Sequence, residues 1–147
     1  MISPPREAFI AEPPAQYLAR PPAVVDCSML CAVLFDEPER DAAERLMSGR
    51  RLLAPELLSH EIVNVALKKL RGGLGEAVVR RALGDFADND IELSKIDALR
   101  QFALAQRYGL SAYDAAYLEL AAQHKAPLLT YDDKLGRAAQ LHLRTLD

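Results

Sequence analysis

The chain has 147 residues, of which 50% are hydrophobic and 27% are charged, a balance typical of one compact soluble domain. Its formal net charge of −3 argues against a protein that coats nucleic acid by bulk charge, although a local basic groove is compatible with it. The sequence has neither an apolar run long enough to span a bilayer nor a signal peptide near its start, so we expect a cytoplasmic protein without membrane contact.

Residues 1–22 contain six of the nine prolines, arranged as the pairs Pro4-Pro5, Pro13-Pro14 and Pro21-Pro22. Such a segment favours extended backbone and is unsuited to a helix or a central strand. We interpret it as a proline-rich N-terminal extension to a domain that spans residues 23–147. A misassigned start is the alternative interpretation. It requires a non-methionine start codon, because the next methionine, Met29, lies after Asp26.

Beyond residue 22 the hydrophobic pattern alternates between short strands and helices. In chain order it predicts a strand at 23–26, helices at 29–35 and 38–47, a strand at 52–54, helices at 55–70 and 76–87, a strand at 91–93, helices at 98–108 and 111–124, a strand at 127–130, a helix at 134–141 and a strand at 143–145. This order predicts a three-layer α/β fold, with a mostly parallel, short-stranded sheet covered by helices on both faces. In such folds a ligand binds beyond the carboxyl ends of the strands.

Two aspartates follow predicted strands and are expected at that edge of the sheet. Asp26 ends the strand in VVDCS, and Asp132 follows the strand in LLTYDDK. Each also fits the N-cap of the next helix, where a carboxylate oxygen accepts a backbone N–H. Taken alone, either position is explained by capping.

Two further acids lie on predicted helices. Asp114, in LSAYDAAYLELA, follows Ser111 by three residues, a spacing that also fits a capping box. Glu61 lies in the middle of the helix that contains HEIVN, where it shares a polar stripe with Asn64 and Lys68. A solvated helix face explains Glu61 equally well.

Considered together, the four acids indicate a metal site. Carboxylates that share one pocket repel and raise one another's pKa values, and a divalent cation removes that penalty. Oxygen ligands favour Mg²⁺ or Mn²⁺. A zinc cluster is not expected, because the three histidines are far apart and Cys27 and Cys31 do not form a CxxC pair. The two thiols are interpreted as reduced and structural.

The segments VVDCS, HEIVN, LSAYDAAYLELA and LLTYDDK, in this order, resemble the acidic motifs of PIN domains. The resemblance is greatest to bacterial VapC-like toxins of type II toxin–antitoxin pairs, and it covers Val24 to the C-terminus. It implies a PIN-like fold and a metal-dependent endoribonuclease that hydrolyses RNA phosphodiester bonds. In such chemistry a bound Mg²⁺ lowers the pKa of a coordinated water and screens charge on the phosphoryl oxygens. A cognate antitoxin and a second copy of the chain in a homodimer are the implied protein partners.

The resemblance also implies roles for individual residues. The four acids that bind the catalytic Mg²⁺ or Mn²⁺ match Asp26, Glu61, Asp114 and Asp132. Polar residues expected to hold the carboxylates or metal-bound water match Ser28, Asn64 and Thr130, with local backbone capping as the alternative. Candidate contacts with RNA phosphates are Lys68, Lys69, Arg71, Lys134 and Arg137, with an ordinary charged surface as the alternative. Asp133 either joins or replaces Asp132 at the metal, or lies outside the site.

Single positions argue against other acidic phosphoryl-transfer or metal proteins. A receiver-type switch needs a pair of acids at the first strand, where only Asp26 is present. A haloacid-dehalogenase phosphatase needs a second aspartate where Ser28 stands, and the HExxH zinc motif fails at Asn64. The remaining alternative is a catalytically inactive PIN-like module that binds RNA or a partner.

Overall fold

The computed structural model describes residues 2–13 and 20–147, which form five strands and seven helices. The strands are β1 (Phe9–Ala11), β2 (Pro22–Val25), β3 (Arg51–Pro55), β4 (Ile91–Ser94) and β5 (Leu128–Thr130). The helices are α1 (Cys27–Leu34), α2 (Arg40–Met47), α3 (Leu58–Arg71), α4 (Glu76–Asp88), α5 (Ala98–Tyr108), α6 (Ala112–His124) and α7 (Asp133–Leu143). All of the predicted helices form, with ends that shift by a few residues.

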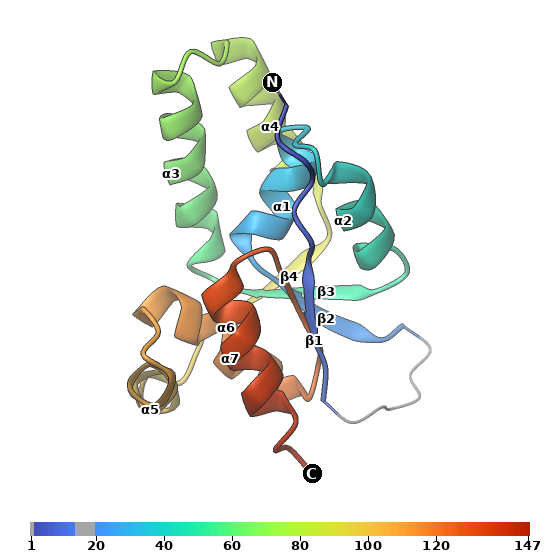
Figure 1. Cartoon of the computed structure of the whole chain (residues 1–147). Helices are drawn as coiled ribbons and strands as arrows, with labels where there is room; N and C mark the ends of the chain where they lie inside the picture. Colours follow the sequence, from blue (N-terminus) through green and yellow to red (C-terminus); the bar gives the residue numbers. More distant parts are fainter. Residues whose placement is uncertain (1, 14–19) are drawn as a thin grey trace.

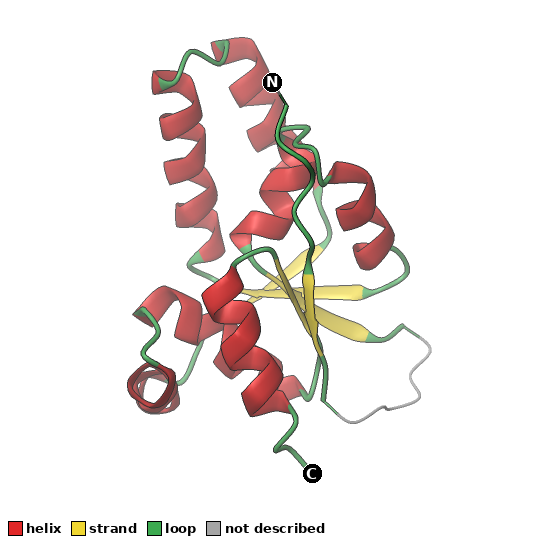
Figure 2. Cartoon of the chain, in the orientation of Figure 1, coloured by secondary structure: helices red, strands yellow, loops and turns green. Residues whose placement is uncertain are grey.

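The strands form one sheet in the order β1-β5-β2-β3-β4 (Figure 2). β2 pairs parallel with both β3 and β5, β3 pairs parallel with β4, and β1 pairs antiparallel with β5. In Figure 1, helices α1 to α4 lie above the sheet and helices α5 to α7 lie below it. The structure therefore confirms the predicted three-layer α/β fold with a mostly parallel sheet.

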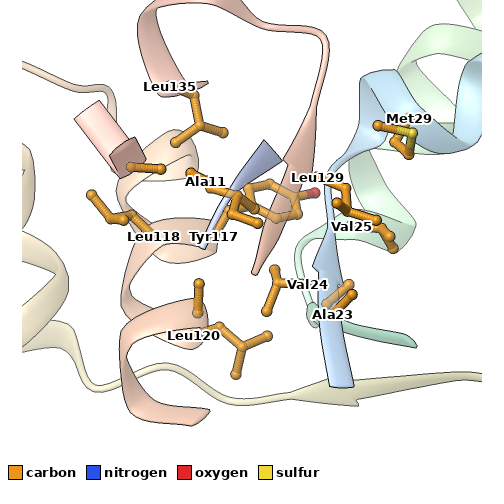
Figure 3. Packing of buried hydrophobic residues seen from close by; sticks show 14 of the residues in the cluster. Ala11, Ala23, Val24, Val25, Met29, Tyr117, Leu118, Leu120, Leu129 and Leu135 are labelled. Carbon is orange, nitrogen blue, oxygen red and sulfur yellow. The ribbon is translucent and has the colours of Figure 1, made fainter. Parts of the chain in front are cut away.

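The core lies between the central strands and α6. Every residue of β2 and β5 is buried, as expected for strands covered on both faces. Helix α6 contacts β2, β3 and β5 on one side and α5 and α7 on the other, so its residues 115–121 are all buried. Figure 3 shows Tyr117 of α6 among the apolar side chains of Val24, Val25 and Leu129. This packing fixes the carboxyl ends of β2 and β5 relative to α6.

The structure adds one edge strand that the sequence did not predict and corrects one predicted strand. Residues 9–11 of the proline-rich segment form β1, so this part of the segment packs on the domain as an edge strand. The strand predicted at 143–145 is wrong, because α7 continues to Leu143 and the Thr145 N–H bonds to His142 O at 3.0 Å in a turn. The physical reason is that the N–H groups of Arg144 and Thr145 both bond to His142 O at the end of α7, so local turn bonds replace sheet pairing there. Pro14 lies outside the described residues.

Within the described part of the chain, no helix combines the length and the hydrophobicity that a bilayer crossing requires.

Candidate active site

A cleft of about 920 Å³ opens at the carboxyl ends of β2 and β5, where the parallel-sheet topology predicts a ligand site. Its walls come from α1, α3, α6, the turn between α3 and α4, and the N-terminal segment. The four predicted acids, Asp26, Glu61, Asp114 and Asp132, all line it. Residues up to 106 positions apart in the sequence thus meet in one place because the parallel strands end at the same edge.

Asp26 lies at the end of β2 with only 5% of its surface exposed, and it is the N-cap of α1. Its Oδ1 accepts hydrogen bonds from the Ser28 hydroxyl at 2.7 Å and the Met29 N–H at 3.0 Å, and its Oδ2 accepts one from the Thr130 hydroxyl. Burial nevertheless raises the pKa of Asp26 to about 6, and the negative charge of Asp132 adds to the rise. The carboxylate is held in one orientation at a desolvation cost that a neighbouring cation would offset.

Asp132 follows β5 and is the N-cap of α7, where its Oδ1 accepts a backbone N–H at 2.7 Å. Its own N–H donates to Thr130 Oγ1 over 2.9 Å, so Thr130 bridges Asp132 and Asp26. Asp133 is not among the residues that line the cleft, and it pairs with Arg137, with 2.9 Å between Oδ2 and Nε. The geometry therefore favours Asp132 over Asp133, and capping coexists with a place in the cleft.

Glu61 on α3 and Asp114 in the first turn of α6 complete the acidic set. The Tyr117 hydroxyl donates to Glu61 Oε1 over 2.6 Å. Burial raises the pKa of both carboxyls; the charge of Asp114 adds to the rise at Glu61, and that of Asp132 adds to the rise at Asp114. These repulsions, together with that between Asp26 and Asp132, link all four carboxylates electrostatically.

The predicted supporting residues divide into two that hydrogen-bond to Asp26 and one that does not. Ser28 accepts a hydrogen bond from the Tyr131 N–H at 2.9 Å while donating to Asp26, so it joins α1 to the end of β5. Thr130 is fully buried and donates to the same carboxylate. Asn64 is exposed on α3 and does not line the cleft.

Of the five predicted basic residues, two line the cleft and three do not. Lys68 and Lys69 of α3 line the cleft. The other three, Arg71, Lys134 and Arg137, are exposed and lie outside its lining. The charge of Lys134 partly offsets the rise in the pKa of Asp114, so this lysine lies near the acidic edge of the sheet. Arg137 instead forms an ion pair with Asp133.

Two features of the cleft, Tyr117 and Arg6, were not predicted from the sequence, whereas the state of the two thiols agrees with its prediction. Tyr117 is only 1% exposed, and its place in the α6 pattern indicates a core aromatic residue without revealing that its hydroxyl reaches α3. Arg6 enters the lining from the proline-rich segment, which carries no motif for it. Cys27 and Cys31 lie with their sulfurs 3.6 Å apart and are not disulfide-bonded. Their hydrogen bond and burial raise the pKa of Cys27, in keeping with a reduced structural pair.

The donor set fits a hard divalent cation in its chemistry. The acids offer carboxylate oxygens, and their raised pKa values indicate an electrostatic cost that positive charge relieves. Among residues 2–13 and 20–147, no three His, Cys, Asp or Glu side chains are close enough together to hold a metal ion. The carboxylates therefore line the walls of an open cleft and do not form a closed cage.

The fold and the acidic cleft define an α/β protein with a carboxylate-lined site at the strand ends. The sequence model of the PIN domain matches residues 23–141, and the chain belongs to the PIN domain family. The chain is 35% identical over 119 residues to Ribonuclease VapC3 of Pyrobaculum aerophilum, covering 77% of this chain and 91% of that protein. It is 34% identical over 119 residues to Ribonuclease VapC9 of Mycobacterium tuberculosis, covering 80% of this chain and 91% of that protein.

A solved structure supports the same fold. The crystal structure of PAE2754 from Pyrobaculum aerophilum matches with a TM-score of 0.64 at 23% identity, covering 81% of each chain. The sequence relatives agree with the resemblance to VapC-like PIN domains seen in the acidic motifs, and this structure supports the fold.

Proposed function

We propose that the protein is a metal-dependent endoribonuclease that hydrolyses RNA phosphodiester bonds and acts as the toxin of a type II toxin–antitoxin pair. The observation that carries this proposal is the convergence of Asp26, Glu61, Asp114 and Asp132 on one cleft, each from a different element. The names of the VapC ribonucleases to which the chain is similar support the reaction class.

The same four carboxylates are the proposed ligands of Mg²⁺, with Mn²⁺ as the alternative metal. When bound, such an ion supplies Lewis acidity and lowers the pKa of a coordinated water. Asp26 is the best-ordered ligand candidate, because three donors fix its two oxygens. Ser28 and Thr130 thus act as positioning residues for Asp26, and Tyr117 does the same for Glu61.

The basic residues of the cleft are proposed to bind the RNA backbone. Lys68 and Lys69 are on the same helix as Glu61, both about two turns further along, and they line the same cleft. Their ammonium groups are suited to phosphates that flank the scissile one. Local positive charge of this kind lets a protein with a net charge of −3 hold a polyanion.

Cleavage of RNA by the purified protein tests the proposal. We expect cleavage with Mg²⁺ or Mn²⁺, its loss in EDTA, and a fall of at least about 100-fold for Asp26→Asn and for Asp114→Asn, because each removes a ligand charge. Arg80→Gln, on the exposed surface of α4, is the matched control and is expected to cleave normally. Cleavage that survives both acid substitutions would refute the site. Metal-independent RNA binding without cleavage would instead support the inactive-module alternative.

A cognate antitoxin and a second copy of the chain are the proposed protein partners, in the cytoplasm. Exposed apolar side chains on α3 and α4, namely Val63, Leu67, Leu70 and Val78, support a protein-binding surface on this helical hairpin. A short neighbouring reading frame whose product suppresses RNA cleavage when co-purified would support the toxin assignment. Light scattering of the purified chain tests the homodimer, and a monomer at all accessible concentrations would reject it.

A further inference from the structure

The N-terminal segment is fastened to the domain at several points. Phe9 to Ala11 pair with Thr130 to Leu128, which places β1 directly beside the strand that leads into Asp132. Ala11 is buried in the core. In Figure 1 the N-terminal segment continues from β1 past α1 and α2, toward the helical layer that carries α3. This path brings the residues before β1 to the mouth of the acidic cleft.

Arg6 is held in a defined position along this path. Its backbone N–H and its Nε both donate to Glu39 Oε1, at 2.9 Å and 2.7 Å. Its guanidinium carbon lies 5.4 Å from the centre of the Tyr131 ring, a cation–π distance, and Tyr131 immediately precedes Asp132. Glu39 is only 3% exposed. Movement of Arg6 away from it would leave a buried carboxylate without its ion-pair partner, which is energetically costly.

The side-chain hydrogen bond to Glu39 occupies only one edge of the Arg6 guanidinium. An arginine side chain has five N–H donors, and Glu39 takes the one on Nε. Among the described residues, the nearest ionic partner of the terminal nitrogens is Glu37, with 3.7 Å between Nη2 and Oε2, which is too long for a hydrogen bond. The side chain of Arg6 remains 52% exposed and lines the cleft. The fork of terminal nitrogens is therefore free to bind an anion there.

We propose that Arg6 is a substrate-binding residue whose terminal guanidinium nitrogens bind an RNA phosphate next to the one that is cleaved. The inference rests on the proposed ribonuclease function and adds to it a residue outside the region that the PIN domain model matches. Arg6 lies in the lining with Asp26 and Asp132, while Lys68 and Lys69 enter from α3. The cleft that holds the acids is thus lined by cations from two separate segments, and these can contact different phosphates of one RNA strand.

Arginine suits this position better than a lysine would. Its planar fork binds a phosphate through two parallel hydrogen bonds, and its orientation is set in advance by the Glu39 carboxylate and the Tyr131 ring. A bidentate phosphate contact is stronger than the long, partly exposed ion pair with Glu37, so the phosphate displaces that contact.

The test measures binding of a short single-stranded RNA that the parent protein cleaves, in an Asp114→Asn background that prevents turnover. Fluorescence anisotropy gives the dissociation constant over a series of KCl concentrations. Arg6→Gln is expected to raise the dissociation constant about five- to tenfold and to reduce the slope of log Kd against log salt by about 0.7, the loss of one single-strand phosphate contact. Arg144→Gln, which removes an exposed cation outside the cleft, is expected to change neither quantity.

A second variant separates substrate binding from a purely structural role. Arg6→Gln alone leaves Glu39 buried without its ion-pair partner, whereas the double variant Arg6→Gln/Glu39→Gln removes both charges and keeps groups that can hydrogen-bond. We expect the double variant to regain thermal stability but to keep the weakened binding and the reduced salt slope. A double variant that regains both stability and parental RNA binding would overturn the role of Arg6. A parent protein that neither binds nor cleaves RNA would reject the proposed function itself.

Discussion

At the scale of the residue, Asp26 combines strong local hydrogen bonding with an unfavourable charge. Three donors stabilise its ionised form, yet burial at 5% exposure raises its pKa from 3.8 to about 6. The desolvation of the carboxylate therefore outweighs the hydrogen bonds, and the nearby Asp132 adds repulsion. The ionised carboxylate of Asp26 therefore destabilises the metal-free protein, and a bound cation would be attracted by the same negative charge.

This imbalance predicts that Asp26→Asn stabilises the metal-free protein. Because the folded pKa is above the unfolded one, the ionised carboxylate costs stability fully above pH 6, and the cost vanishes as pH falls toward 3.8. The asparagine keeps the cap oxygen and carries no charge. We expect a gain of up to about 3 kcal/mol at pH 8 that shrinks below pH 6, measured by urea unfolding in EDTA.

Addition of Mg²⁺ provides the control for this prediction. Saturating metal should stabilise the parent protein and leave Asp26→Asn nearly unchanged, because the variant lacks a ligand charge. An Asp26→Asn protein that is less stable than the parent at pH 8 in EDTA would show that the cap and hydrogen bonds of Asp26 outweigh its desolvation.

At the scale of the element, the contact between β1 and α7 explains a glycine inside a helix. Glycine in a helix interior costs about 1 kcal/mol relative to alanine. A Cβ on Gly136 would lie 2.3 Å from Phe9 Cγ and 2.6 Å from Phe9 Cβ, far inside contact distance. The absence of a side chain at position 136 thus lets β1 dock closely enough to pair with β5.

The effect of Gly136→Ala on the free energy of unfolding is therefore expected to change sign when the side chain of Phe9 is removed. In the full chain the added methyl group displaces Phe9 and should destabilise the protein by about 1–3 kcal/mol. In a Phe9→Gly background the side-chain atoms that would clash, Cβ included, are absent, and Gly136→Ala should stabilise α7 by about 0.5–1 kcal/mol through helix propensity. A double-mutant cycle from urea unfolding measures the coupling. Additive effects of the two substitutions would contradict the packing account.

At the scale of the whole molecule, β1 closes one edge of the sheet. β5 is a central strand only because β1 covers it, and an uncovered edge of buried, apolar residues is a template for pairing with another chain. The sheet therefore includes residues that precede the sequence-predicted domain of residues 23–147. We propose that the folded domain includes the described N-terminal residues through Ala11.

Removal of residues 1–11 tests this proposal. The truncation exposes the edge of β5 and leaves Glu39 buried without Arg6, so we expect a loss of a few kcal/mol in the free energy of unfolding and concentration-dependent aggregation. Removal of residues 1–3 is the matched control, since Ile2 and Ser3 are exposed. Urea unfolding and light scattering report the two effects. A truncated chain that is as stable and monodisperse as its control would show that the folded domain begins near residue 23.

The local sequence pattern of hydrophobic residues and helix caps was sufficient to predict most of the fold. Helix caps such as Asp26, Ser111 and Asp132 act on backbone groups three residues away, so the sequence shows them directly. Strand-end position also predicted that Asp26 and Asp132 meet, because parallel strands share one carboxyl edge, whereas Glu61 and Asp114 were assigned to the same site from the combined acidic motifs. The strand predicted at 143–145 is wrong because Arg144 and Thr145 bond back to His142 at the end of α7, and a short apolar pattern does not distinguish a helix end from a strand.

The sequence by itself determined the α/β alternation, the acidic residues and their arrival at one edge of the sheet, because hydrophobic periodicity and capping act over a few residues. Only the tertiary structure decided that Tyr117 holds Glu61, that Arg6 reaches the cleft through Glu39, and that β1 completes the sheet. These contacts join residues 56, 33 and more than 100 positions apart. Their free energy depends on burial and geometry that arise only when distant segments pack together, and so leaves no periodic trace in the sequence.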